Sequence, residues 1–174
     1  MATRMTLGVD FGGSASKATL IDEKGNILAT VEKEYPSYSE HPEWMEQQAE
    51  DLYPIFVSNV QDILKKSGVN PNNIVGLAID AATHMAVLTD ESNRPLRRII
   101  HWSDKRSAEE AVWLKKEYGE LLKKHSYNSV SAAWTLPQLI WLNKHEPEIL
   151  QKAKKIYFAK DFLRHQITGD FYTD

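Results

Sequence analysis

The residues best suited to chemistry lie in segment 8–17, which reads GVDFGGSASK. Asp10 closes a short apolar run, two glycines follow, and Ser14 and Lys17 come next. Backbone N–H groups in a tight turn bind phosphate oxygens well, and glycine lets the backbone approach them closely. An aspartate at a strand end can hold hydrated Mg²⁺ against those oxygens, and a lysine adds a positive charge. The spacing therefore indicates a phosphate-binding hairpin, although a plain hairpin with glycines at positive φ and Asp10 as a turn former also fits.

A second polar segment, 80–84, directly follows the apolar run 74–80. Open α/β sheets bind ligands at strand ends, and Thr83 and His84 carry groups that can hydrogen-bond to sugar hydroxyls. The alternative is that His84 is a loop histidine whose hydrogen bonds are satisfied within the protein.

The third segment, 101–106, reads HWSDKR. Trp102 offers a flat apolar face that stacks on a sugar ring, and Asp104 and Arg106 offer directional polar groups. In the alternative, Ser103 or Asp104 caps the helix that begins at residue 107, and Trp102 belongs to the core. Asp104 can serve both roles.

Apolar spacing predicts the elements that position these segments. Three short strands at 5–10, 15–22 and 27–35 are separated by turn signals and form an antiparallel meander. The continuous apolar run 74–80 predicts a strand buried on both faces. We expect further strands at 85–89, 98–102 and 156–159, and helices at 51–66, 107–124, 136–144, 147–153 and 160–168.

The composition narrows the class of protein. The 174 residues are 42% hydrophobic and 26% charged, which excludes a disordered chain. No apolar run approaches the roughly 18 residues that cross a bilayer, and there is no cysteine for disulfides or thiolate sites. The net charge of −3 lacks the basic excess of nucleic-acid binders. We expect a soluble, cytoplasmic α/β or α+β protein with no nucleic-acid or membrane partner.

Together and in this order, the three segments resemble the FGGY family of carbohydrate kinases, which includes xylulokinase, ribulokinase, gluconokinase and glycerol kinase. The family's phosphate hairpin reads roughly D-x-G-[TS]-x-S-x-[KR], and residues 10–17 read DFGGSASK. Further similar stretches are HPEWMEQ at 41–47, IHWSDKR at 100–106, TLPQLIWL at 135–142, KHEPEI at 144–149, AKDFLR at 159–164 and TGDF at 168–171. The stretches from residue 135 on are specific, whereas the hairpin alone is not.

The chain also departs from the family pattern. Gly13 stands where a hydroxyl is usual, Ala15 stands at a frequent serine position, and Gln138 replaces the usual lysine. Residues 80–83 lack the Gln-Met of xylulokinases and look closer to ribulokinase-like relatives. The resemblance therefore identifies the family and not the sugar.

The resemblance implies a ribonuclease H-like (actin-like ATPase) α/β fold, a mixed sheet with flanking helices, and transfer of a phosphoryl group from ATP to a sugar hydroxyl. Asp10 is then the catalytic, Mg²⁺-holding residue. The expected ATP-binding residues are Gly12, Gly13, Ser14 and Lys17, and the expected sugar-binding residues are Thr83, His84, Trp102 and Asp104.

The resemblance also implies an absence. The family's general base is an aspartate in a later G-D-x-x-A-like motif, which does not occur here, and Asp174 is no match for it. Residues 1–174 therefore read as an N-terminal domain truncated at its C-terminal end, without the second lobe and inactive alone. The expected partner is a small-molecule sugar, with a homodimer possible. The alternatives are a non-catalytic actin-like sugar-binding or regulatory module and an ATP-hydrolysing chaperone relative.

Overall fold

The computed structural model describes residues 4–173, so Asp174 lies outside the described residues. The chain divides into two compact units, each built from separate segments. The first unit takes in the residues up to Pro36, residues 50–82 and the residues from Ala159 on, and the second takes in residues 37–49 and 83–158. The assignment of the whole chain to one domain stays a prediction.

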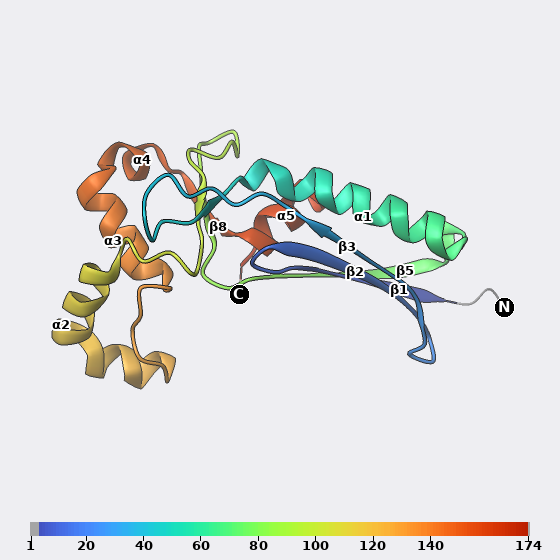
Figure 1. The fold of residues 1–174 in the computed structure, drawn as a ribbon, viewed down its shortest axis with the longest axis horizontal. Helices are drawn as coiled ribbons and strands as arrows, with labels where there is room; N and C mark the ends of the chain where they lie inside the picture. The colour runs from blue at the N-terminus through green and yellow to red at the C-terminus, as the bar shows by residue number, and fades with distance from the viewer. Residues whose placement is uncertain (1–3, 174) are drawn as a thin grey trace. The chain divides into compact units, whose positions relative to one another are not determined.

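A mixed four-stranded sheet forms the first unit (Figure 1). Its strands are β1 (Met5–Phe11), β2 (Ala15–Asp22), β3 (Ile27–Glu34) and β5 (Ile74–Ala81), in the order β3-β2-β1-β5. The first three pair antiparallel, which confirms the predicted meander, and β5 pairs parallel with β1. The carboxyl ends of β1 and β5 therefore lie side by side.

Two helices, α1 (Leu52–Ser67) and α5 (Ala159–Thr168), pack against this sheet (Figure 1). Alternate residues of β1 are buried, including Leu7, Val9 and Phe11, and the residues between them are exposed. Inside the buried layer the Asn59 side-chain amide of α1 donates to the Ser16 hydroxyl of β2 at 2.6 Å. One face of the sheet thus meets helices, and the other carries the polar residues of β1.

The strand at 74–80 forms as β5, but the expectation that both its faces are buried is wrong. Val75 is 52% and Leu77 is 44% exposed. Among the described residues, β5 is one of the two edge strands of the sheet and pairs only with β1. An apolar run reports side-chain character, whereas burial also depends on which neighbours cover the strand.

Short ladders and three helices form the second unit. β4 (Glu46–Gln47) pairs antiparallel with β7 (Ile99–Ile100), and β6 (Ala86–Thr89) pairs antiparallel with β8 (Lys155–Phe158). The helices are α2 (Ala108–Ser126), α3 (Thr135–His145) and α4 (Pro147–Lys152). One cluster of buried side chains consists of Ala86, Leu88, Ile100, Trp141 and Leu142, and a second consists of Ala111, Leu114 and Val130.

Most predicted strand and helix bounds lie within one or two residues of the observed ones, and two of the differences have a clear structural cause. The predicted strand 98–102 is only Ile99–Ile100, because the chain from His101 on turns to make its own polar contacts. The helix predicted from residue 107 begins at Ala108, and Ser107 makes no side-chain cap; its hydroxyl donates to the Ala132 carbonyl at 3.1 Å. Single 3₁₀ turns occupy η1 (Ala49–Asp51) and η2 (Pro71–Asn73).

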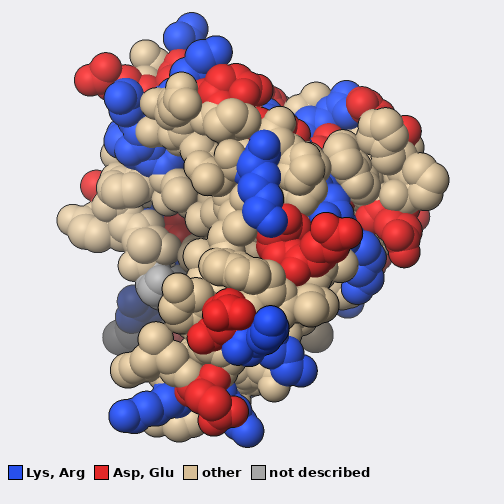
Figure 2. All heavy atoms as spheres, turned by 90° about the vertical axis from the view of Figure 1, so that its left-hand side faces the viewer, with Lys and Arg blue, Asp and Glu red and all other residues tan. Residues whose placement is uncertain are grey.

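Within residues 4–173 no helix has the length and apolar character that crossing a membrane requires. Figure 2 shows basic and acidic side chains interspersed over one face of the molecule rather than gathered by sign.

Candidate functional site

The turn that joins β1 to β2 is closed by a hydrogen bond within its own backbone. The Gly12 N–H donates to the Ala15 carbonyl at 3.0 Å, and a Cβ on Gly12 would lie 3.3 Å from that carbonyl oxygen. Among the described glycines, positive φ occurs at Gly25, Gly68 and Gly169, and none of these lies in this turn. Glycine at position 12 favours the close approach of two backbone segments, and it does not serve the positive φ that the plain-hairpin alternative supposed.

A row of charged side chains crosses the exposed face of the sheet next to this turn. The strand register places Asp10 opposite Lys17 on β2 and opposite Asp80 on β5, and it places Lys17 opposite Glu32 on β3. All four residues are exposed. Because register partners on neighbouring strands point to the same face, one lysine lies between Asp10 and Glu32, while two carboxylates lie next to each other at the carboxyl ends of parallel strands.

A cavity of about 290 Å³ lies on this face. Gly8, which has no side chain, and Ala78, which has a small one, leave this space on the sheet surface open. The lining residues are Gly8, Val9, Asp10, Lys17, Thr19, Ala78, Ile79 and Asp80. Sequence reasoning missed Asp80, although it precedes the end of β5 by one residue just as Asp10 precedes the end of β1.

The donor set of this cavity fits Mg²⁺. In the described part of the chain, no group of three or more histidine, cysteine, aspartate or glutamate side chains could hold a metal by itself. Mg²⁺, however, is usually held by one or two carboxylates together with water and substrate phosphates. The neighbouring carboxylates of Asp10 and Asp80 match that requirement.

His84 is held in an unusual conformation in the second unit. Its φ is +59°, in the left-handed region that non-glycine residues rarely adopt. Its ring stacks on Trp134 with centroids 5.9 Å apart and planes 17° apart, and its Nδ1 lies 3.4 Å from the Thr135 hydroxyl. Burial lowers the pKa of His84, so the imidazole is neutral at pH 7. The neighbouring Thr83 is exposed.

Trp102 and Asp104 differ sharply in exposure. The Trp102 side chain is 46% exposed, whereas Asp104 is 1% exposed. Asp104 accepts hydrogen bonds from the Met45 N–H at 2.6 Å and from the Arg106 N–H at 2.8 Å, so its carboxylate is engaged within the protein. Asp104 does not form the helix cap that the alternative predicted. α2 begins at Ala108, four residues beyond Asp104, and has no side-chain cap.

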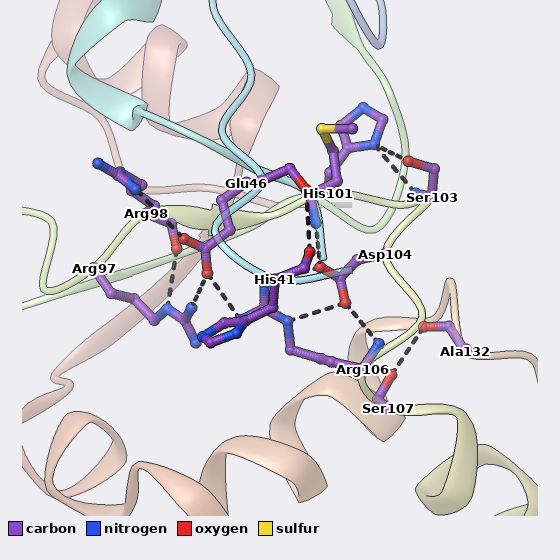
Figure 3. Close-up of polar contacts among 12 residues, drawn as sticks. His41, Glu46, Arg97, Arg98, His101, Ser103, Asp104, Arg106, Ser107 and Ala132 are labelled. Atoms are coloured by element: carbon purple, nitrogen blue, oxygen red, sulfur yellow. Dashed lines mark hydrogen bonds and ion pairs between the residues drawn. The ribbon is translucent and has the colours of Figure 1, made fainter. Parts of the chain in front are cut away.

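A buried charge cluster surrounds Asp104 (Figure 3). The side chain of Arg106 is fully buried and donates to Asp104 through Nε at 3.0 Å and Nη2 at 2.8 Å. Its Nη1 lies 2.8 Å from Glu46, which also pairs with Arg97 at 2.5 Å. The guanidinium stacks 3.9 Å above the ring of Trp44. These contacts fix the loop from His101 to Ser107 and hence the base of Trp102.

The predicted site residues fall into two groups. The turn residues Gly12, Gly13 and Ser14 lie with Asp10 and Lys17 in the first unit, and Thr83, His84, Trp102 and Asp104 lie in the second. In this structure the Gly12 N–H is used inside the turn. Binding of ATP by the first group and of sugar by the second stays a prediction.

Comparison with known proteins identifies relatives over the full chain. The FGGY family of carbohydrate kinases, N-terminal domain, matches residues 5–174. A xylulose kinase from Staphylococcus epidermidis is 29% identical over 174 residues, which is all of this chain and 34% of that protein. The chain thus spans about a third of the length of the curated relatives it matches.

Solved structures agree on the fold. The crystal structure of a xyloylose kinase from Brucella ovis matches with a TM-score of 0.90 and 30% identity over 96% of this chain and 35% of that one. A xylulose kinase from Rhodospirillum rubrum matches with a TM-score of 0.91 over 98% of this chain and 35% of that one; at 21% identity it shows the fold alone. The predicted ribonuclease H-like α/β fold, a mixed sheet with flanking helices, is confirmed.

We predict that Arg106→Met destabilises the protein by about 3–5 kcal/mol, because it leaves the buried carboxylate of Asp104 without its cation. Urea unfolding followed by tryptophan fluorescence measures the loss. The matched control is Arg98→Met, since Arg98 pairs mainly with the exposed Glu40 and its loss costs about 1 kcal/mol or less. Equal losses in the two variants would contradict a special role for the buried cluster.

We predict that His84 titrates with a midpoint below 6.5, because burial disfavours its charged form. The unfolded chain then takes up the proton first as the pH falls, so this residue's contribution to stability is complete above pH 6.5 and is lost below it. A histidine NMR titration, with His84→Asn to assign the signal, measures the midpoint. A midpoint at or above 6.5 would show that the ring is not desolvated.

Proposed function

Because the chain belongs to the FGGY family of carbohydrate kinases, we propose that the full-length protein transfers the γ-phosphoryl group of ATP to a hydroxyl of a sugar or sugar derivative in the cytoplasm. The acceptor is a ketopentose such as xylulose or ribulose, or gluconate. The observation that carries the proposal is the placement of Asp10, Lys17 and Asp80 around one cavity at the carboxyl ends of parallel strands. Charged oxygens of a nucleotide need such a combination of a cation and metal-holding carboxylates.

In the proposed site, Asp10 and Asp80 hold Mg²⁺, and Lys17 contributes a fixed positive charge next to Asp10. The ion, when bound, neutralises charge on the phosphate oxygens. Gly12, Gly13 and Ser14 form the turn that faces the phosphates, and the Gly12 N–H keeps that turn closed through its bond to the Ala15 carbonyl. Phosphoryl transfer depends on alignment and charge neutralisation, so this chain's residues act by positioning.

The second group of residues binds the sugar. Neutral His84 and the exposed Thr83 hydrogen-bond to hydroxyls, and the half-exposed Trp102 stacks on the sugar. Asp104 contributes indirectly: together with Arg106 it holds in place the loop that carries Trp102. The general base that takes the hydroxyl proton is supplied from outside residues 1–174, so this chain alone is inactive.

A panel of sugars tests the proposal. The full-length protein is incubated with ATP, Mg²⁺ and each of xylulose, ribulose, gluconate and glycerol, and ADP release is measured against a reaction without sugar. We expect one or a few sugars to stimulate ADP release. Sugar binding by calorimetry without any ADP release would instead support the alternative, a non-catalytic actin-like sugar-binding or regulatory module.

We predict that Asp10→Asn lowers the rate of sugar phosphorylation more than tenfold, which corresponds to about 1.4 kcal/mol or more in the barrier, because the amide removes the charge that holds the metal. The control is Glu32→Gln, which removes a carboxylate from the same exposed face but on β3, outside the cavity. We expect the control to retain the wild-type rate. An Asp10→Asn enzyme within about tenfold of wild type would exclude the metal-holding role.

A further inference from the structure

Tyr35 directly follows β3 and makes two hydrogen bonds to the β1–β2 turn. Its backbone N–H donates to the Ser14 carbonyl at 3.1 Å, and its hydroxyl donates to the Gly12 carbonyl. The side chain is 8% exposed, and its ring lies 6.1 Å from that of Phe11, the last residue of β1. Tyr35 therefore donates to two carbonyls of the turn from a position just after β3, a strand outside the β1–β2 hairpin.

The hydrogen bond from the Tyr35 hydroxyl to the Gly12 carbonyl also sets the direction of the Gly13 N–H. The Gly12 carbonyl and the Gly13 N–H belong to one planar trans peptide unit, in which they point in opposite directions. With the carbonyl turned toward the buried Tyr35 hydroxyl, the Gly13 N–H is turned away from it. Glycine has the widest choice of backbone angles, so two successive glycines need such an external contact to keep one orientation.

The Tyr35 hydroxyl is a donor at every physiological pH. Burial, together with the nearby Asp10 carboxylate, raises the pKa of Tyr35 to about 12. The hydroxyl therefore stays protonated, and the contact to the Gly12 carbonyl does not switch off between pH 5 and 9. The turn and the Asp10 carboxylate both belong to the first compact unit.

We propose that Tyr35 is a positioning residue that holds the turn at Gly12, Gly13 and Ser14 in the shape that binds the phosphates of ATP. This inference rests on the proposed function and deepens it. Tyr35 acts through the backbone that it holds and touches no reacting atom. Position 13 has no hydroxyl of its own in this chain, so the orientation of its peptide group carries the interaction that a side chain could otherwise make.

The test is Tyr35→Phe in the full-length protein, with affinity for a non-hydrolysable ATP analogue and for the preferred sugar measured separately by calorimetry. The ring and its packing remain, and the hydroxyl is lost. We expect the nucleotide affinity to fall by about tenfold, since the Gly12 carbonyl loses its donor, and the sugar affinity to change by less than about twofold. We also expect the backbone amides of residues 12–15 to exchange hydrogen faster.

The matched control is Tyr157→Phe. Tyr157 is 1% exposed and donates its hydroxyl to the Asn93 side chain at 2.7 Å in the second unit, so the control removes a buried tyrosine hydroxyl without touching the turn. We expect the control to bind nucleotide and sugar as wild type does, and thermal unfolding of both variants to confirm that they fold.

The outcomes separate the inference from the proposed function. Wild-type nucleotide affinity and unchanged amide exchange in Tyr35→Phe would overturn the inference alone. An equal loss of nucleotide affinity in Tyr157→Phe would also overturn it, because the effect would then be general destabilisation. A wild-type protein that binds no ATP would overturn the proposed function, and the inference with it.

Discussion

The parallel pairing of β1 with β5 is the interaction on which the rest of the first unit depends. β1 has an antiparallel partner on its other side, so this pairing makes the sheet mixed and brings two strand ends to the same edge. The register then decides the chemistry, because it places two carboxylates as direct neighbours. Like charges opposite each other on a sheet repel, and a bound cation offsets that repulsion. A shift of one residue would turn one of the two acids toward the helices.

In the second unit, buried charged residues join distant chain segments, which is usually done by apolar side chains in a core. Arg106 lies between aromatic rings and two acids, and it connects segments that are far apart in the sequence. Taking a guanidinium out of water is costly unless nearly all of its donors are matched. The planar fork of arginine matches two of its nitrogens, Nε and Nη2, to Asp104, which lysine could not do, and Nη1 is compensated by the charge of Glu46 at 2.8 Å. The exposed Trp102 is thus anchored by residues that themselves are not exposed.

Much of this architecture could be predicted because it is local. Turn residues and alternating side chains were enough for the meander, and apolar spacing at helical period was enough for α1 and α5. The environment of Asp104 could not be predicted from the short pattern around it. Its partner Arg106 also contacts Glu46 and Trp44, which lie about 60 positions earlier in the sequence, and these contacts bury the surroundings of Asp104. Asp80 and Tyr35 gained significance only from the folded sheet, which brings residues 70 and 23 positions apart in the sequence close together. The exposure of Val75 depends on what lies beside β5, which the apolar run does not encode.

The left-handed backbone at His84 limits which residues fit that position without strain. A side chain with a Cβ costs about 1 kcal/mol or more in this conformation, and glycine or asparagine would adopt it more readily. The turn alone therefore gives no reason for a histidine. In the proposed site the imidazole is the group that this position supplies to the sugar, so the backbone strain there would accompany binding rather than folding.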